Sequence, residues 1–152
     1  LVVAFQRAWA GDAQPRIGVY DLTLKTWTFM FYPLEAVASP AGGWVGLSEI
    51  TALGNNRFMV VERDNQFGPD ARIKRLYTVD ISTATNGSTL TKTLVRDLLA
   101  DLKAPKGNVY EKIEGATVTA AGDVWIVNDN DGVDDGANSG ETQMLNLGKL
   151  FR

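Results

Sequence analysis

Two stretches of the chain repeat one plan of strands and turns, and this repeat constrains the fold more than any other feature. Residues 46–65 read GLSEITALGNNRFMVVERDN, and residues 111–131 read EKIEGATVTAAGDVWIVNDND. In each, an acidic residue (Glu49 or Glu114) opens an apolar strand, a small polar turn follows, and a second hydrophobic strand ends in a polar cluster. Self-similarity of this kind indicates a supersecondary unit that the chain uses more than once.

Short segments rich in Val, Tyr, Phe, Trp and Thr alternate with turn residues along the chain, which is typical of β-strands. The predicted strands are residues 1–7, 16–22, 26–34, 46–53, 57–64, 74–82, 90–99, 113–120, 123–130 and 141–151. Helical character is confined to residues 95–104, which predict about one turn after a strand. The hydrophobic content of 45% is enough for a packed core.

Four antiparallel strands in a repeated unit are typical of a β-propeller blade. A β-sandwich, the main alternative, also uses short strands at regular spacing, but it does not predict that equivalent turns repeat their chemistry. A blade takes about 40–50 residues. The chain is therefore predicted to be all-β, a β-propeller fragment of about two and a half to three four-stranded antiparallel blades.

The expected units have the following boundaries. Residues 1–40 form an incomplete blade without a recognisable opening strand, residues 41–106 form a complete blade, and residues 107–152 form a last blade that lacks its closing strand. We expect the ring to be closed by an absent N-terminal segment or by a partner chain. Without such closure an exposed strand edge remains, and exposed edges favour pairing with another chain.

Composition excludes several classes of function. The sequence has no His and no Cys, so these residues alone build no Ser-His-Asp triad, no His general base and no zinc site with His or thiolate ligands. The net charge of −3 argues against a nucleic-acid partner. No apolar stretch approaches the roughly 20 residues that cross a bilayer, so no membrane span is predicted.

The repeat predicts where the acidic residues meet. In a blade, the innermost strand starts at the end of the molecule where the second strand finishes, so Glu49, Glu114 and the clusters 62–65 and 128–131 are expected in one polar ring near a central channel. Carboxylates about 4 Å apart repel one another by about 4 kcal/mol at an effective dielectric of 20. Some must keep protons, a cation must sit among them, or Arg63 must neutralise a neighbour.

Carboxylate and amide oxygens without His or Cys favour Ca²⁺ over zinc. The candidate metal ligands are Glu114, Asn128, Asp129, Asp131, Glu49 and Asp64, and the candidate catalytic residues are Glu114, Asp129 and Glu49. An EF-hand is excluded, because neither Gly132 nor Gly136 can serve as the loop glycine with ligands at the required positions. A solvated turn remains the alternative for residues 128–136, since Asn, Asp and Gly dominate turns.

The segments RIGVYDLTLKTWTFMFYPLE, GLSEITALGNNRFMVVERDN, IEGATVTAAGDVWIVNDNDG and GETQMLNLGKLF resemble the phytase-like domain family, also called "esterase-like activity of phytase". The resemblance implies a secreted or periplasmic β-propeller hydrolase that cleaves an ester or phosphoester of an anionic small molecule, with calcium assisting. The alternative is a non-catalytic propeller, a binding or scaffold module with at most a structural calcium. Whether the chain is an enzyme stays open between these two readings.

Other polar and aromatic residues are interpreted more simply. Scattered cations such as Lys74, Arg75, Lys103, Lys106 and Lys112 are interpreted as a solvated surface rather than as phosphate contacts. The tryptophans are expected to pack between blades, with Trp44, beside two glycines, as the one that faces a ligand. Ser48 has no His to activate it, and the sequon at Asn86 is first of all an Asn-Gly hairpin turn.

Overall fold

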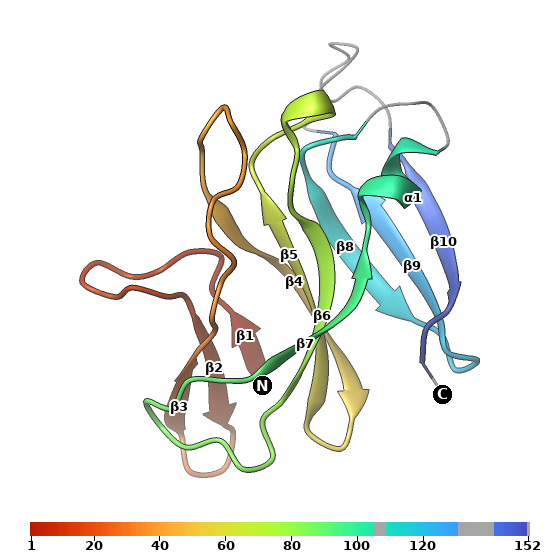
Figure 1. Ribbon diagram of the computed structural model, residues 1–152. Coiled ribbons are helices and arrows are strands. Elements are labelled where there is room, and N and C mark those ends of the chain that lie inside the picture. The colour runs from red at the N-terminus through yellow and green to blue at the C-terminus, as the bar shows by residue number, and fades with distance from the viewer. Residues whose placement is uncertain (105–108, 131–141, 152) are drawn as a thin grey trace.

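The computed structural model describes residues 1–104, 109–130 and 142–151, which form three antiparallel sheets (Figure 1). The first sheet contains β1 (Val2–Ala4), β2 (Arg16–Asp21) and β3 (Thr26–Phe31). The second sheet contains β4 (Val45–Gly54), β5 (Arg57–Asp64), β6 (Lys74–Asp80) and β7 (Lys92–Asp97). The third sheet contains β8 (Ile113–Val118), β9 (Asp123–Asn128) and β10 (Met144–Lys149). The prediction of an all-β chain is confirmed.

The helical content of the described residues is small. The helix α1 (Leu99–Lys103) directly follows β7, as the sequence predicts, and a 3-10 turn, η1 (Gly68–Asp70), lies between β5 and β6. Neither element has the length and apolar character that a membrane-crossing helix requires. Both lie in connections between strands, and Leu102 of α1 is buried in the core between the second and third sheets (Figure 1).

The first strands of the three sheets, β1, β4 and β8, are neighbours in space. The backbone N–H of Leu47 in β4 donates to the carbonyl of Gln6, just after β1, at 3.0 Å. On the other side of β4, the Ser48 hydroxyl donates to the Ile113 carbonyl at 2.6 Å, and the Thr51 hydroxyl donates to the Ala116 carbonyl at 3.0 Å. These bonds fix β8 against β4, and the second sheet therefore stands between the other two.

The first sheet opens with β1, which lies within the predicted strand of residues 1–7, although the sequence analysis did not recognise that strand as the opening strand of a unit. β1 pairs with β2 in the place that β4 and β8 take in their own sheets. It has three residues, so it is shorter than the predicted strand. Beyond β3, residues 86–90 run alongside the sheet edge, with a parallel bridge between Phe31 and Thr89 and a 2.7 Å bond from the Gly87 N–H to the Phe29 carbonyl.

Two hydrophobic clusters hold the sheets together. One joins the first and second sheets and includes Ile17, Met30 and Val60. The other joins the second and third sheets and includes Met59 and Ile126. Since successive residues of a strand point to opposite faces, β5 is buried on both sides, which explains its continuous apolar run.

The outer face of the first sheet is aromatic. Trp27 and Phe29 stack with ring centroids 5.4 Å apart, and Trp9 packs edge-on against Phe29 at 5.3 Å. The Arg16 guanidinium lies 4.3 Å from the Trp9 ring and is paired with Asp12 at 2.7 Å. Trp27 is 43% exposed, so this face is an apolar surface that the described residues do not cover.

Candidate functional site

The polar clusters lie at one end of the sheets, as predicted. Asp64 at the end of β5 is opposite Val45 at the start of β4, and Asn128 at the end of β9 is opposite Ile113 at the start of β8. The bond between Ser48 and Ile113 brings these two strand starts together. Residues far apart in sequence thus meet at the end of the molecule where β5 and β9 finish and β4 and β8 start (Figure 1).

The structure contains both copies of the repeat, but the sequence analysis aligned their acidic residues one position out of register. The ladder pairs are Leu47 with Glu62, Glu49 with Val61, Ile113 with Asn128, and Gly115 with Val127. By this register Ser48 is the equivalent of Glu114, and Glu49 is the equivalent of Gly115. Both positions lie at a register shift, where an extra residue re-aims the local side chains.

Glu49 and Glu114 nevertheless come together. Both line a cavity of about 360 Å³ whose other walls come from β1, from Gln6 and from Leu47, Ser48 and Ile50 of β4. One carboxylate oxygen of Glu49 accepts the N–H of Ile50 at 2.8 Å. The cavity therefore holds acidic side chains from two different sheets, which is the central expectation of the sequence analysis.

Arg63 neutralises Glu114. Its Nη2 donates to Glu114 Oε1 at 2.6 Å, and its Nη1 lies 3.7 Å from Glu111 Oε1. The Arg63 side chain is 2% exposed, whereas that of Glu114 is 35% exposed. The ion pair therefore has a buried cation and an accessible carboxylate. Of the three solutions that the sequence left open, internal neutralisation is the one that the structure shows for Glu114.

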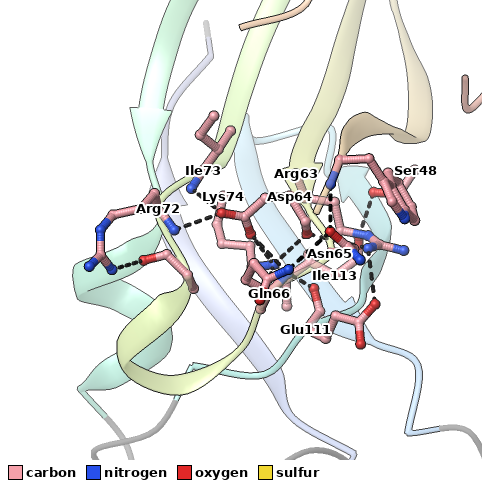
Figure 2. A network of polar contacts seen from close by, with 12 residues as sticks. Ser48, Arg63, Asp64, Asn65, Gln66, Arg72, Ile73, Lys74, Glu111 and Ile113 are labelled. Carbon is pink, nitrogen blue, oxygen red and sulfur yellow. Dashed lines mark hydrogen bonds and ion pairs between the residues drawn. The ribbon is translucent and has the colours of Figure 1, made fainter. Parts of the chain in front are cut away.

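Asp64 is paired with a second internal cation, Lys74 (Figure 2). Both side chains are almost fully buried, and Lys74 Nζ lies 2.9 Å from Asp64 Oδ1. Nζ also donates to the carbonyls of Asp64, Gln66 and Glu111, each at 2.8 Å. Burial lowers the pKa of Lys74 to about 8. The interpretation of Lys74 as a solvated surface residue is therefore wrong.

The remaining oxygen of the Asp64 carboxylate also has partners. Asp64 Oδ2 accepts the backbone N–H groups of Arg72 and Ile73 at 2.7 and 2.9 Å. The carboxylate thus fixes the chain where it enters β6. The Asp64 carboxylate therefore has a structural role, because its oxygens bind Lys74 and the backbone of the connection between β5 and β6.

Glu62 belongs to a separate cluster on the opposite face of β5. Its Oε2 accepts a hydrogen bond from Lys92 Nζ at 2.7 Å, and its Oε1 accepts the N–H of Glu35 at 2.7 Å. Burial and the Glu62 charge raise the pKa of Tyr32, and burial together with its bond to Glu35 raises the pKa of Tyr77 to about 12. The single polar ring predicted from sequence is therefore wrong, because consecutive residues of β5 point to opposite faces.

The segment after β9 is described only in part. Asn128 is buried, its side-chain oxygen accepts the N–H of Gln143, and its own N–H donates to the Gln143 carbonyl at 3.2 Å. The Asp129 N–H donates to the Lys112 carbonyl at 2.8 Å. Asp131 lies outside the described residues. Within residues 1–104, 109–130 and 142–151, no three acidic side chains gather closely enough to hold a metal ion.

Sequence reasoning missed Lys74 and Lys92 as partners of buried carboxylates. A signal for Lys74 was present: it lies two residues before Leu76 in the strand KRLYTVD, so the alternation places both on the same buried face. Lys92 opens β7, where the pattern is weak because Thr93 and Leu94 are exposed. Glu35 lies in a connection, and no local pattern identifies it.

The comparisons with known proteins add a family assignment. The model of the family described as "Phytase-like: Esterase-like activity of phytase" matches residues 1–132. No curated protein and no solved structure matches the chain. The matched segment includes the cavity residues Glu49 and Glu114 and the ion pairs of Arg63, Lys74 and Lys92 described above. The chain belongs to the phytase-like family, whose description is the esterase-like activity of phytase.

Proposed function

We propose that the chain is a hydrolase domain that cleaves an ester or phosphoester of an anionic small molecule in the cavity between β1, β4 and β8. The observation that carries this proposal is that Glu49 and Glu114, from two sheets, line one cavity. Membership of the phytase-like family supports hydrolysis as the reaction class.

The chemistry available in the cavity is that of a carboxylate base. The sequence has no His, and the Ser48 hydroxyl is engaged with the Ile113 carbonyl, which makes it a poor nucleophile. Glu114 is accessible to solvent and is held by Arg63. In the proposed step, the Glu114 carboxylate takes a proton from a water molecule as the water oxygen attacks the ester carbon or the phosphorus. The bond from that atom to the leaving alcohol oxygen then breaks, and Glu114 returns the proton to this oxygen, which releases the alcohol and restores the carboxylate. Glu49 and Asp129 are the further candidates for catalysis.

The experiment compares Glu114→Gln and Glu49→Gln with the unaltered protein on two probes, p-nitrophenyl acetate and p-nitrophenyl phosphate. Loss of a general base lowers kcat by about 10²–10⁴-fold, and we expect Glu114→Gln to fall in this range with its urea midpoint little changed. Glu111→Gln is the matched control, because Glu111 also faces Arg63 but does not line the cavity. Unchanged hydrolysis in Glu114→Gln would refute the proposal.

The second candidate function is a binding or scaffold module without catalysis. The observation in its favour is that the pairs Arg63–Glu114 and Asp64–Lys74 connect segments of different strands and loops, which is a structural role. If Glu114→Gln and Asp129→Asn unfold the protein while neither probe is hydrolysed by the unaltered protein, the scaffold is favoured.

The expected calcium ion does not fit all of its candidate ligands. Both carboxylate oxygens of Asp64 accept hydrogen bonds from Lys74 or the backbone, and Oε1 of Glu114 accepts one from Arg63, so we do not propose these two residues as calcium ligands. We keep calcium as a proposal for the acidic segment that starts at Asn128 and Asp129, and the proposed step does not depend on it. Calorimetric titration with calcium tests it: no heat and no gain in Tm would remove the ion.

We also propose that the three sheets are consecutive blades of a β-propeller. The adjoining first strands and the stacked faces support this arrangement, and the aromatic face around Trp27 is suited to packing against a further sheet from the remaining blades or a partner chain. A structure of the protein with additional sheets that leaves Trp27 in solvent would contradict it. Secretion or a periplasmic location remains a prediction from the family.

A further inference from the structure

We propose that Arg63 is the positioning residue of the reaction: it holds Glu114 in the orientation in which its second carboxylate oxygen meets the attacking water. This inference rests on the proposed function and adds a residue that does not itself line the cavity. Arg63 comes from β5 and reaches Glu114 on β8, so it acts across two sheets.

The Arg63 guanidinium is held from several sides. Nη2 donates to Glu114 Oε1 at 2.6 Å, Nη1 donates to the Asp64 carbonyl at 3.4 Å, and Nη1 lies 3.7 Å from Glu111. With 2% exposure, the side chain has little freedom to choose another rotamer. A guanidinium held in this way fixes the position of the Glu114 carboxylate oxygen that it contacts.

Trp44 supports the guanidinium from its face. The Arg63 guanidinium carbon lies 5.4 Å from the Trp44 ring centroid, and that of Arg7 lies 5.1 Å from it. The Trp44 backbone is fixed in turn, because its N–H donates to Asn65 Oδ1 at 2.7 Å and its carbonyl accepts the Asn65 N–H at 3.0 Å. The tryptophan beside the glycines therefore has a specific role here: it is part of the wall that holds Arg63.

The backbone of Glu114 is set independently of Arg63. Glu114 lies at the register shift between Ile113 and Gly115, and bulges of this kind re-aim side chains next to active sites. The Ser48 hydroxyl fixes the adjoining Ile113 carbonyl. The bulge thus turns the Glu114 side chain, and Arg63 fixes its Oε1. Fixing one carboxylate oxygen restricts the directions that the other can take.

The test is a double-mutant cycle of Arg63 and Glu114 variants. For each variant, kcat and KM are measured with the p-nitrophenyl probe that the unaltered protein hydrolyses. Misplacing a reacting group by about 1 Å costs on the order of 10²-fold in rate, so we expect Arg63→Met to lower kcat by about 10- to 100-fold with KM unchanged. Arg63→Lys, which keeps the charge and one donor, is expected to recover part of this loss. In a Glu114→Gln background, Arg63→Met is expected to cause no further loss, because residues that act as a unit are not additive.

Lys92→Met is the matched control, since Lys92 is also a cation paired with a carboxylate and only 12% exposed, but lies with Glu62 on the opposite face of β5. It is expected to lower stability and to leave kcat unchanged at temperatures where the variant is folded. If Glu114→Gln hydrolyses the probe normally, the proposed function fails, and this inference fails with it. If Glu114→Gln loses activity while Arg63→Met keeps it, or if the two losses multiply, only the positioning role is refuted.

Discussion

Replacing Lys92 by Met is the most direct test of the polar cluster between the first and second sheets. Glu62 has 0% exposure, and its carboxylate has two bonds, one from Lys92 Nζ and one from the Glu35 N–H, each 2.7 Å long. Met preserves the unbranched apolar part of the Lys92 side chain. The variant therefore removes the charge while changing the packing little. The Glu62 carboxylate keeps the backbone bond from Glu35 but loses its counterion, and the 3.1 Å ion pair between Lys92 and Glu35 is lost as well.

The expected loss follows from this geometry. Unit charges 2.7 Å apart attract by about 6 kcal/mol at an effective dielectric of 20. Part of this is offset, because Met does not have to be desolvated as an ammonium group is. Removing one partner of a buried pair costs about 3–5 kcal/mol, and we expect Lys92→Met to lower the free energy of unfolding by this amount. A domain of this kind has about 5–15 kcal/mol in total.

Urea denaturation of four variants measures the effect: Lys92→Met, Glu62→Gln, the two combined, and Lys103→Met. Lys103→Met is the control, because Lys103 is exposed at the end of α1, and it is expected to change stability by less than about 0.5 kcal/mol. Lys92→Met combined with Glu62→Gln removes the uncompensated charge and is expected to be more stable than Lys92→Met alone. A loss below about 1 kcal/mol in Lys92→Met, or a double variant that is the sum of its parts, would refute the reasoning.

Further predictions concern packing and pH. A Cβ at Gly46 would lie 2.6 Å from the Gln6 carbonyl oxygen, so Gly46→Ala is expected to cost about 1–3 kcal/mol in urea denaturation. Burial lowers the pKa of Lys74 from 10.5 to about 8. Between these two values the unfolded chain binds one more proton than the native chain, so the free energy of unfolding should rise from pH 8 toward pH 10 by up to about 1.4 kcal/mol per pH unit. Lys74→Met should abolish this rise. Burial raises the pKa of both Tyr32 and Tyr77; the native state keeps protons that the unfolded chain releases above pH 10, so stability should fall there by up to about 2.8 kcal/mol per unit. Urea midpoints and tyrosinate absorbance measure both effects, and a flat profile from pH 8 to 12 would contradict them.

The strands were predictable because their signals are local. Period-2 alternation, β-branched and aromatic residues, and turns such as Gly54-Asn55-Asn56 lie within a few residues of one another. The brevity of β1 and the bulges at Ser48 and Glu114 were not predictable in this way. A bulge adds one residue to one strand without changing the composition, so it shifted the alignment of Glu49 with Glu114 by one position.

The candidate site was predictable to the extent that it follows from the repeat. The proximity of Glu49 and Glu114 could be predicted from two copies of one unit that lie side by side. The separation of Glu62 from Arg63 followed from alternation along β5, and was missed because the polar cluster was treated as one group. The choice of Lys74 and Lys92 as counterions depends on which strands pack together, and no short stretch of sequence contains that information.

Residues 86–90 connect the unfolding of two different sheets. They belong to the connection between β6 and β7, yet their backbone bonds join β3, with the Leu90 N–H donating to the Phe31 carbonyl at 2.9 Å. Repeated sheets commonly unfold as semi-independent neighbours. Here the loss of β7 would release the outer edge of the first sheet as well. Amide hydrogen exchange is therefore expected to report one shared opening event for β3 and β7, two strands that belong to different sheets.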